Sequence, residues 1–352
     1  MILFSLGIPG AFSDWCDALA HRIASEAHAG VTPVSVDSLA ELGLAQIRTA
    51  SPHFIGISRT PGQDLRLAQL DHRSRIVLAL DDPRHALADL VHKHGFPLLG
   101  AVRAIANSCA SLVRYLDYPD LLVLRPEKAR DAPREVAAAM CKHYDLGLPQ
   151  PLSVEPAPFE TGQRIDECES WWASLDEPDR ILADGAIGAY SQCFATGNLD
   201  RIAWDRRLFF SGDTPSESPP ASIDITGRGR CLIYGPYIRI PPGTWTARIE
   251  LGCTDEAAGT QFVVDAAAGH RLGHVTFSPK FGGVFETALP FTLEEDNPHL
   301  LEIRFFVERS SFEGRLALGA VTLLPTLRPQ AIDRHGLRVP LGLTGTRQSS
   351  RT

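Results

Sequence analysis

Residues 5–16, SLGIPGAFSDWC, have the pattern of a strand that runs into a short loop and then into a helix. In α/β proteins such a loop often holds a phosphate group, because the first N–H groups of the helix are unpaired and partly positive. Phosphate loops usually add a lysine or arginine. This stretch has neither and contains Asp14. The pattern therefore predicts the shape of a phosphate site without the cation that phosphate binding needs.

A second turn with polar chemistry stands at residues 81–89, DDPRHALAD. Asp82 directly before Pro83 predicts the start of a helix, with the aspartate as its N-cap. Ser13 and Asp14 have the same interpretation, as caps of a helix expected to begin there. The two turns are therefore compatible with purely structural roles as well as with ligand binding.

No metal site is predicted. His92 and His94 are two residues apart, a spacing that does not bring two side chains to one face of a helix. The seven cysteines include no C-x-x-C pair, which favours buried apolar cysteines over zinc ligands or disulfides.

The elements that must position these residues follow a regular rhythm up to about residue 148. Strands flanked by helices in this order predict a parallel sheet with helices on both faces. Asp131, just ahead of Pro133, predicts another N-cap. The expected strands are 2–8, 53–59, 75–81 and 120–126, and the expected helices are 13–28, 84–94, 98–117 and 131–145.

The composition changes at residues 147–163, which hold four prolines and predict a linker, followed by helix to about residue 200. After Trp204 the apolar pattern has period two, which is typical of half-buried antiparallel strands. The stretch 244–251, TWTARIEL, is one example. We expect an α/β domain at 1–148, a linker and helical segment at 149–203, a β-sandwich of jelly-roll type at 204–328 and a disordered tail at 329–352.

Composition excludes several classes of function. The chain has 352 residues, of which 44% are hydrophobic, so a folded core is expected. Its net charge of -8 disfavours a nucleic-acid partner. No apolar run is long enough to span a bilayer, and no basic leader follows Met1, so we expect a cytoplasmic protein.

The first 148 residues resemble the sulfotransferase family, whose fold is a P-loop NTPase-like α/β domain that binds 3'-phosphoadenosine 5'-phosphosulfate. The family's first loop lines up with 9–15, its second motif with 81–89, and its last strand, turn and helix with 123–148. The resemblance implies that six residues stand at cofactor positions: Gly10, Ser13, Asp14, Asp81, Arg84 and Asp89.

The departures from the family pattern are changes of charge. Gly10 stands where the family has a cation, and Asp81 and Asp89 stand where an arginine and a serine hold the 3'-phosphate. A cation about 4 Å from a phosphate contributes about 4 kcal/mol at an effective dielectric near 20, and an anion there reverses the sign. We therefore expect no cofactor. Sulfuryl transfer also needs a base, and the candidate, His53, stands at the head of its strand, whereas such sheets keep chemistry at the other end.

Residues 224–251 resemble the C-terminal β-sandwich modules of bacterial polysaccharide-biosynthesis proteins, in which a YGPY..LPPG.W segment precedes a long strand. Sugar recognition needs flat aromatic faces and fixed polar groups. Tyr237 and Trp245 are candidates for the faces and Arg239 for a polar group. The alternative is that these aromatics fill the core or a turn. Further candidates of the same two kinds are Tyr234, Arg228 and Arg230.

Three functions remain open. The first is a degenerate sulfotransferase-like protein that binds a glycan or a partner protein during bacterial exopolysaccharide assembly. The second is an active sulfotransferase that moves a sulfuryl group to a saccharide hydroxyl. The third is a scaffold in which Trp171 and Trp172 dock on a partner, which requires both rings to be exposed. The charge reversals favour the first, and the oligomeric state stays open.

Overall fold

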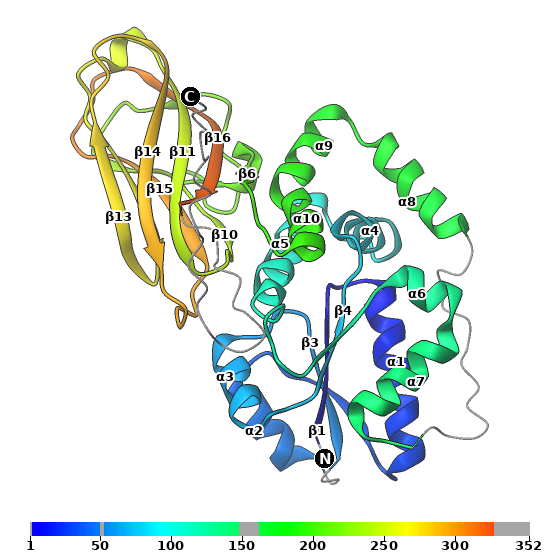
Figure 1. Cartoon of the computed structure of the whole chain (residues 1–352). Coiled ribbons are helices and arrows are strands. Elements are labelled where there is room, and N and C mark those ends of the chain that lie inside the picture. The colour runs from blue at the N-terminus through cyan, green and yellow to red at the C-terminus, as the bar shows by residue number, and fades with distance from the viewer. Residues whose placement is uncertain (1, 50–52, 148–161, 327–352) are drawn as a thin grey trace, which may run out of the picture.

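The computed structural model of the chain describes residues 2–49, 53–147 and 162–326, and its first half is built on one parallel sheet (Figure 1). The sheet has five strands in the order β2-β3-β1-β4-β5, all of them parallel. The strands are β1 (Ile2–Gly7), β2 (Thr32–Ser35), β3 (Phe54–Ser58), β4 (Ile76–Ala79) and β5 (Leu121–Leu124).

Helices cover both faces of this sheet because successive side chains of each buried strand point in opposite directions. Leu3 of β1 packs with α1, α6 and α7, whereas Phe4 and Leu6 pack with α2, α3 and α5. The predicted arrangement is confirmed. The helices are α1 (Ala11–Ala27), α2 (Leu39–Arg48), α3 (Gln63–Asp71), α4 (Pro83–Ala88), the π-helical turn η1 (Asp89–Lys93), α5 (Leu98–Val113), α6 (Pro126–Asp131) and α7 (Pro133–Tyr144).

Two local predictions fail in this half. Asp131 does not cap a helix: it is the last residue of α6, and Ala132 stands at the N-cap of α7 ahead of Pro133. The edge strand β2 was not predicted. Its sequence, TPVS, is mostly exposed and includes a proline, so it lacks the apolar run that marks the buried strands.

Helices follow the linker in the part of the chain that is described. These helices lie against α4 and α5 of the first half. Asp176 caps α9 by accepting a hydrogen bond from the N–H of Asp179, and Gly197 ends α10 in the left-handed conformation at φ 75°. The segment comprises α8 (Gly162–Ser174), α9 (Glu177–Ala183), the π-helical turn η2 (Asp184–Gly188) and α10 (Ala189–Thr196).

The second half is a sandwich of two antiparallel sheets, so the expected combination of an α/β domain and an all-β domain is confirmed. One sheet has the order β13-β12-β15-β9-β7 with β10 on β15, and the other has the order β14-β11-β16-β6 with β8 on β16. The strands are β6 (Ile202–Trp204), β7 (Phe210–Ser211), β8 (Ile223–Asp224), β9 (Arg230–Tyr234), β10 (Pro236–Ile238), β11 (Gly243–Cys253), β12 (Phe262–Ala268), β13 (His270–Phe277), β14 (Gly283–Leu293), β15 (Leu301–Val307) and β16 (Arg315–Pro325), with short 3-10 turns η3 (Arg206–Leu208) and η4 (Asp255–Ala257).

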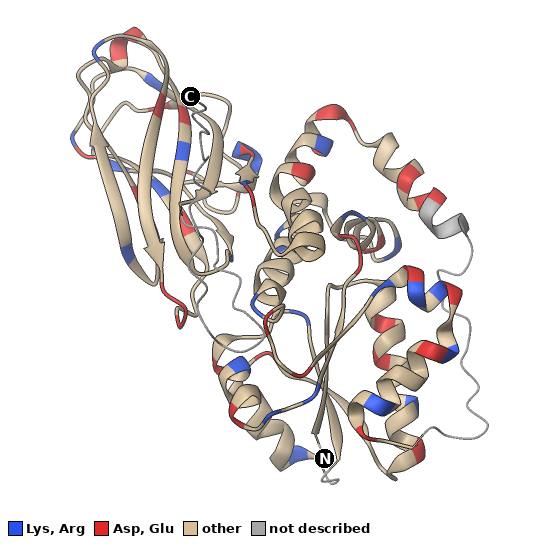
Figure 2. Cartoon of the chain, viewed as in Figure 1, with Lys and Arg blue, Asp and Glu red and all other residues tan. Residues whose placement is uncertain are grey.

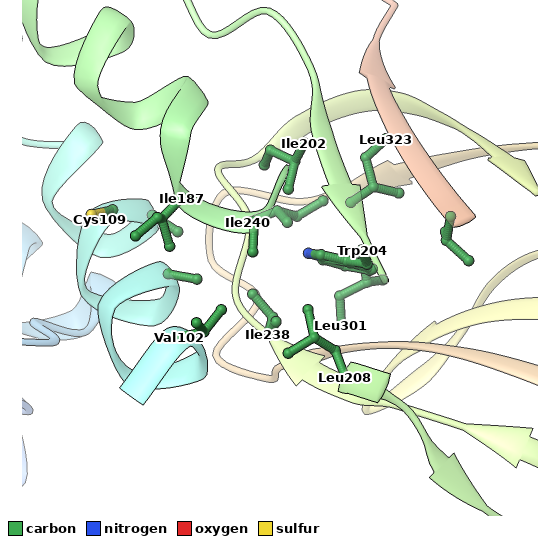
Figure 3. Close-up of a cluster of buried hydrophobic side chains, with 14 of the residues drawn as sticks. Val102, Cys109, Ile187, Ile202, Trp204, Leu208, Ile238, Ile240, Leu301 and Leu323 are labelled. Carbon is green, nitrogen blue, oxygen red and sulfur yellow. The ribbon is translucent and has the colours of Figure 1, made fainter. Parts of the chain in front are cut away.

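The sandwich and the α/β domain share one hydrophobic core (Figure 3). Ile238 and Ile240, at β10 and just after it, lie opposite Val102 of α5, and Ile187 of η2 joins the same cluster. Trp204, at the end of β6, is fully buried beside them. Burial of this much apolar surface between the two halves favours one rigid arrangement over two freely moving domains.

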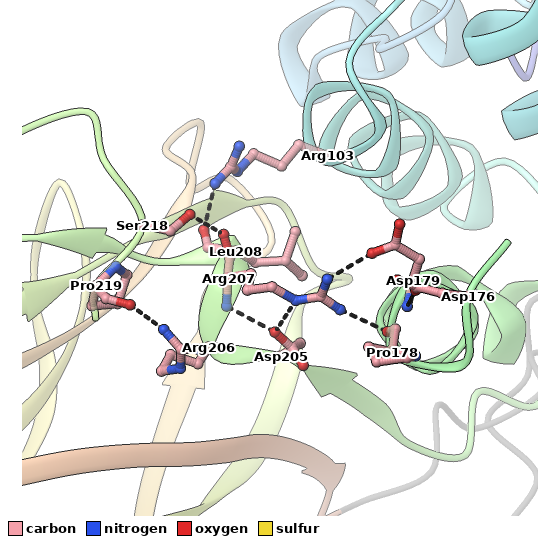
Figure 4. Close-up of polar contacts among 10 residues, drawn as sticks. All are labelled: Arg103, Asp176, Pro178, Asp179, Asp205, Arg206, Arg207, Leu208, Ser218 and Pro219. Atoms are coloured by element: carbon pink, nitrogen blue, oxygen red, sulfur yellow. Dashed lines mark hydrogen bonds and ion pairs between the residues drawn. The ribbon is translucent and has the colours of Figure 1, made fainter. Parts of the chain in front are cut away.

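Polar contacts reinforce the same junction (Figure 4). Arg207 of η3 donates to the carboxylate of Asp179 on α9, at 2.6 Å. Arg103 of α5 donates to the backbone carbonyl of Leu208, also at 2.6 Å, and its guanidinium lies 4.6 Å from the ring centre of Phe210. The helical segment and α5 therefore both hold the first turn of the sandwich.

Two general predictions concern the cysteines and membrane-spanning segments. All seven cysteines are free, and six of them are buried, as expected for cysteines that act as small apolar residues. Within the described ranges, no helix has both the length and the apolar character needed to cross a membrane. Figure 2 shows charges of both signs interleaved along α6 and α7. The residues expected to form the tail, 329–352, and most of the linker lie outside the described residues.

Candidate functional site

The loop between β1 and α1 has only three residues, Ile8 to Gly10, and delivers the chain directly to the N-terminus of α1. Gly10 is the N-cap residue, with φ 151° and ψ 176°, a conformation that side chains rarely adopt. A Cβ atom at Gly10 would lie 3.3 Å from a carboxylate oxygen of Asp89. The glycine therefore gives Asp89 room to approach the start of the helix.

Asp89 accepts a hydrogen bond at the N-terminus of α1, the part of a helix that favours anions. Its Oδ2 accepts a hydrogen bond of 3.0 Å from the N–H of Ala11, the first residue of α1. Its Oδ1 lies 3.1 Å from the ammonium group of Lys93, one turn further along η1. The residue is 1% exposed. A negative charge at a helix N-terminus is stabilised by the helix dipole, and here the chain itself supplies that charge.

Ser13 and Asp14 do not cap α1, because the helix begins at Ala11, earlier than predicted. The Ser13 hydroxyl is buried and donates to the backbone carbonyl of Ile8 at 2.6 Å, which ties the loop to the helix. Asp14 is largely exposed and forms an ion pair of 3.1 Å with Arg59. Both side chains therefore have structural partners at this end of the sheet.

A buried polar network beside this loop was not predicted. Asp17 accepts a hydrogen bond of 2.6 Å from Ser5 in β1 and pairs with Arg59, which follows β3. Burial raises the pKa of Asp17, and the contacts with Arg59 and Ser5 oppose that rise. The sequence carries only a weak signal for this network. Asp17 interrupts an apolar helix face, and its two partners, Ser5 in β1 and Arg59 after β3, are far from it in the chain.

The second turn folds as a helix start, as predicted. Asp82 accepts a hydrogen bond from the N–H of Arg84 at 2.8 Å and has Pro83 after it. The buried carboxylate of Asp81 accepts from the N–H of Asp82 at 2.8 Å and lies 3.6 Å from a ring nitrogen of His85. These groups organise the turn between β4 and α4.

Arg84 is the one cation among the residues that the resemblance placed at the cofactor. Its guanidinium forms an ion pair with Asp184 of η2 and lies 5.1 Å from the ring centre of Trp172 on α8. Arg84 therefore binds the helical segment. Trp171 and Trp172 are both half-buried, which does not meet the exposure that the scaffold hypothesis requires.

The residues at this end of the sheet do not fit 3'-phosphoadenosine 5'-phosphosulfate. The position of the family's loop glycine is held by Phe12, which is fully buried in the core and ring-stacked with Trp15. Asp89 already occupies the first free N–H of α1. A phosphate there would lie against a carboxylate, which Coulomb repulsion disfavours.

His53 lies at the opposite end of the parallel sheet from the loop before α1, so the structure does not bring this candidate base together with the other candidate residues. It precedes β3, whose five residues separate it from Arg59 at the other end. At about 3.3 Å per residue, that separation is roughly 17 Å or more. The His53 ring stacks on His28 with centres 4.4 Å apart, and desolvation, followed by nearby positive charge, lowers its pKa.

Tyr237 lies in a cluster of aromatic rings on the sandwich, next to the junction. Its ring centre is 5.8 Å from Phe210 and 6.0 Å from Tyr234. The residue has φ 61° and is half-buried. Burial, and then the carboxylate of Glu302, raises the pKa of its hydroxyl. Tyr237 keeps part of its surface open, as a sugar-stacking residue requires.

The other two predicted sugar-binding residues make contacts within the protein. Trp245 is 2% exposed and donates from its indole nitrogen to the carbonyl of Pro241 at 3.0 Å. The ring is part of the core, so the prediction that it contacts a sugar is wrong. Arg239 donates its backbone N–H to Asn107 of α5 at 2.6 Å, which anchors the segment on the α/β domain. Arg230 is paired with Asp213 at 2.8 Å.

The outer face of the sheet beside Tyr237 carries a polar group that the sequence analysis missed. Asp265 of β12 is fully buried and binds Arg304 of β15 through two hydrogen bonds, of 2.7 and 2.9 Å. Arg271 of β13 donates to the same carboxylate at 2.9 Å. Phe306 lies 5.7 Å from the Arg304 guanidinium. We call Tyr237, Arg271, Arg304 and Phe306 the outer-face cluster.

The outer-face cluster follows from strand alternation. In β15, Leu301, Ile303, Phe305 and Val307 are buried, so Glu302, Arg304 and Phe306 point the other way. The single aspartate within FVVDAAA of β12 was the available signal, because an aspartate in an otherwise apolar strand must be paired when it is buried.

No protein-family model matches the sequence, and no curated protein matches it. Among solved structures, the chain is similar to mouse sulfotransferase SULT7A1 complexed with PAP, with 9% identity, a TM-score of 0.34, and coverage of 50% of this chain and 68% of that chain. It is similar to a sulfotransferase from Alicyclobacillus acidocaldarius, with 13% identity, a TM-score of 0.29, and coverage of 50% and 98%.

The chain is also similar to the CBM36-1 domain of a multidomain xylanase from the hindgut metagenome of Trinervitermes trinervoides. The identity is 9% and the TM-score is 0.24, with coverage of 35% of this chain and 96% of that domain. The fold class stated here follows from the strand order and pairing described above.

Proposed function

We propose that this chain is a non-catalytic, sulfotransferase-like protein that binds a glycan through its sandwich during assembly of a bacterial polysaccharide. The observation that carries the non-catalytic part is the hydrogen bond from the N–H of Ala11 to the buried carboxylate of Asp89. At the helix N-terminus that a phosphorylated donor would use, a carboxylate with the same sign of charge as a phosphate already accepts the N–H.

The outer-face cluster supports a glycan as the ligand. Tyr237 and Phe306 offer partly open rings for stacking, and Arg271 and Arg304 offer donors that Asp265 fixes in place. The side chain of Arg271 is 54% exposed and that of Arg304 is 30% exposed, while Asp265 is not exposed at all. Fixed donors beside flat apolar faces are the arrangement that orients a sugar ring.

Calorimetric titration with 3'-phosphoadenosine 5'-phosphate tests the first part. We expect no binding up to about 1 mM, which corresponds to less than about 4 kcal/mol of binding free energy. A dissociation constant in the micromolar range would overturn the proposal and restore the active sulfotransferase. In that case an assay for transfer of a sulfuryl group to a saccharide hydroxyl would follow.

Affinity electrophoresis of the full chain in gels that contain soluble polysaccharides tests the second part. We expect retardation by at least one polysaccharide and a loss of about fivefold in affinity in Phe306→Ala and in Tyr237→Ala, since one aromatic contact contributes about 1 kcal/mol. Phe312→Ala is the matched control, because this phenylalanine is 97% exposed and lies outside the cluster. Equal retardation of all variants, or none of the wild type, contradicts glycan binding at this face.

A further inference from the structure

Three arginines meet where α3, α5 and the sandwich come together. Arg66 lies on α3, Arg114 directly follows α5, and Arg239 lies between β10 and β11. Arg114 is only 8% exposed. Burial, and then the positive charges of Arg239 and Arg66, lower the pKa of Arg114 to about 10. The fold therefore places the positive charges of Arg66 and Arg239 close to that of Arg114, which is itself buried.

Only one of the three has a carboxylate partner among the described residues. Arg66 pairs with Asp117 at 2.9 Å. Arg114 reaches neutral oxygens at long range, the side-chain oxygen of Gln63 at 3.4 Å and the backbone carbonyl of Glu295 at 3.3 Å. Its Nε is buried and makes no hydrogen bond within the described part of the chain. Its donor groups are thus largely unused.

Arg239 is in a similar position. Its guanidinium makes one side-chain hydrogen bond among the described residues, a 3.4 Å contact with the carbonyl of Pro298. Desolvation lowers its pKa, and the charges of Asp37 and Asp64 oppose that change from a distance. Both carboxylates are already used at α2 and β3, where they accept hydrogen bonds from Leu39, Ser58 and Thr60. The charge of Glu295 likewise opposes the fall in the pKa of Arg114 without an ion pair between the two side chains.

We propose that Arg114 and Arg239 form a binding site for an oxyanion group, a carboxylate, sulfate or phosphate on a small ligand, at the junction of the α/β domain and the sandwich. A buried guanidinium without an anion is unfavourable, and an oxyanion would supply the missing charge and accept the unused N–H groups. The planar fork of arginine suits this chemistry better than an ammonium group does.

The burial of these contacts also indicates from which side a ligand would enter the site. The contact of Arg239 with Pro298 lies at the surface, that of Arg114 with Glu295 is partly buried, and that of Arg114 with Gln63 is buried. The ligand group would therefore meet Arg239 first and Arg114 behind it. This inference does not rest on the proposed glycan function, because it uses neither the outer-face cluster nor Asp89.

Isothermal titration calorimetry at constant ionic strength tests the site by measuring the binding of four probes: glucuronate, N-acetylglucosamine 6-sulfate, glucose 6-phosphate and neutral glucose. We expect at least one charged sugar to bind with a dissociation constant below about 1 mM and glucose not to bind. The charged sugar that binds identifies the oxyanion. Arg114→Gln should weaken that binding at least about tenfold, as expected for loss of a charged hydrogen bond.

Arg248→Gln is the matched control, because Arg248 is an exposed arginine of β11 on the sandwich and should leave binding unchanged. If Arg114→Gln does not fold, Arg239→Gln gives the decisive comparison, since Arg239 is less deeply buried than Arg114. Absence of binding by all three charged sugars overturns the proposal. Equal binding by the wild type and the folded variant also overturns it.

Discussion

Asp89 decides what the N-terminus of α1 can bind, and its effect on stability can be measured. Asp89→Ala removes the acceptor of the Ala11 N–H and the partner of Lys93. Loss of a capping oxygen costs about 1 kcal/mol, and loss of a favourable charge at the helix dipole adds about 0.5 kcal/mol. We expect the free energy of unfolding in urea to fall by about 1–2 kcal/mol.

Glu135→Ala is the control for that measurement, because Glu135 is an exposed acidic residue in the first turn of α7. A change within about 0.5 kcal/mol is expected there. If Asp89→Ala is as stable as the wild type, Asp89 is not the anion that α1 uses, and the proposed loss of the phosphate site loses its support.

His143 gives a prediction for pH dependence. It lies on α7, and its Nε2 contacts the carbonyl of Ile76 at 3.0 Å. Burial lowers its pKa from the usual 6.5, so between the folded pKa and 6.5 the unfolded chain binds more protons than the folded chain. Stability from this group is therefore lost as pH falls from 6.5 through the folded pKa. In urea unfolding, the stability of His143→Gln should fall less steeply than that of the wild type as pH is lowered below 6.5, and equal slopes would contradict the prediction.

At the scale of residues, sequence reasoning worked where the physical cause is local. The cap formed by Asp82 and Pro83 depends on neighbours in the chain and was predicted correctly. Asp89 and Ala11 are 78 positions apart, so their contact needs the fold to exist first. The same holds for Asp265, whose partner Arg304 comes from another strand.

At the scale of elements, the segment from Tyr234 to Trp245 joins the two halves of the molecule. Asn107 accepts the backbone N–H of Arg239 at 2.6 Å, and this contact fixes β10 against α5. Asn107→Ala leaves that N–H without its acceptor, which costs about 1–3 kcal/mol in a buried setting. We expect a loss of that size in urea unfolding.

Asn198→Ala serves as its control, since Asn198 is exposed and contacts only its own turn. A loss in Asn107→Ala no larger than that in Asn198→Ala would show that the anchor is unimportant. The resemblance of this segment to polysaccharide-related modules pointed to sugar contact, yet two of its three named residues, Trp245 and Arg239, serve packing and docking.

Elements were predictable when their burial left a pattern. The period-two strands of the sandwich, such as β11 and β15, alternate buried and exposed side chains along their length. The other four strands of the parallel sheet, β1, β3, β4 and β5, are short apolar runs and were predicted. Strands β2 and β10 were missed because they are short, contain proline and take their strand geometry from a neighbour.

At the scale of the whole molecule, one core extends from α5 through η2 to the sandwich. Elements that share a core unfold together, so we expect a single transition in urea, with tryptophan fluorescence and far-ultraviolet circular dichroism coincident. Trp204 reports on the junction because it is fully buried there. Ile240→Asp places a charge in this core. We expect it to lower the free energy of unfolding by more than about 3 kcal/mol, or to make the α/β domain and the sandwich unfold in separate transitions.

Arg248→Asp is a suitable control, since it also introduces an aspartate but replaces an exposed side chain on β11. Two separate transitions in the wild type would contradict the shared core. The docking itself could not be predicted from sequence. Ile238 and Ile240 look like any apolar strand residues, and nothing local indicates that they pack on Val102 of a distant helix.

The carboxylate of Asp89 has a consequence for how the molecule depends on the cell's metabolites. A protein that needs a bound nucleotide to satisfy a helix terminus gains stability by mass action, so its folded fraction rises and falls with supply of that nucleotide. Here the counter-charge is attached to the same chain, and its local concentration is constant. The α1 terminus has its counter-charge as soon as the polypeptide folds, so this terminus adds no dependence of stability on the concentration of a free ligand.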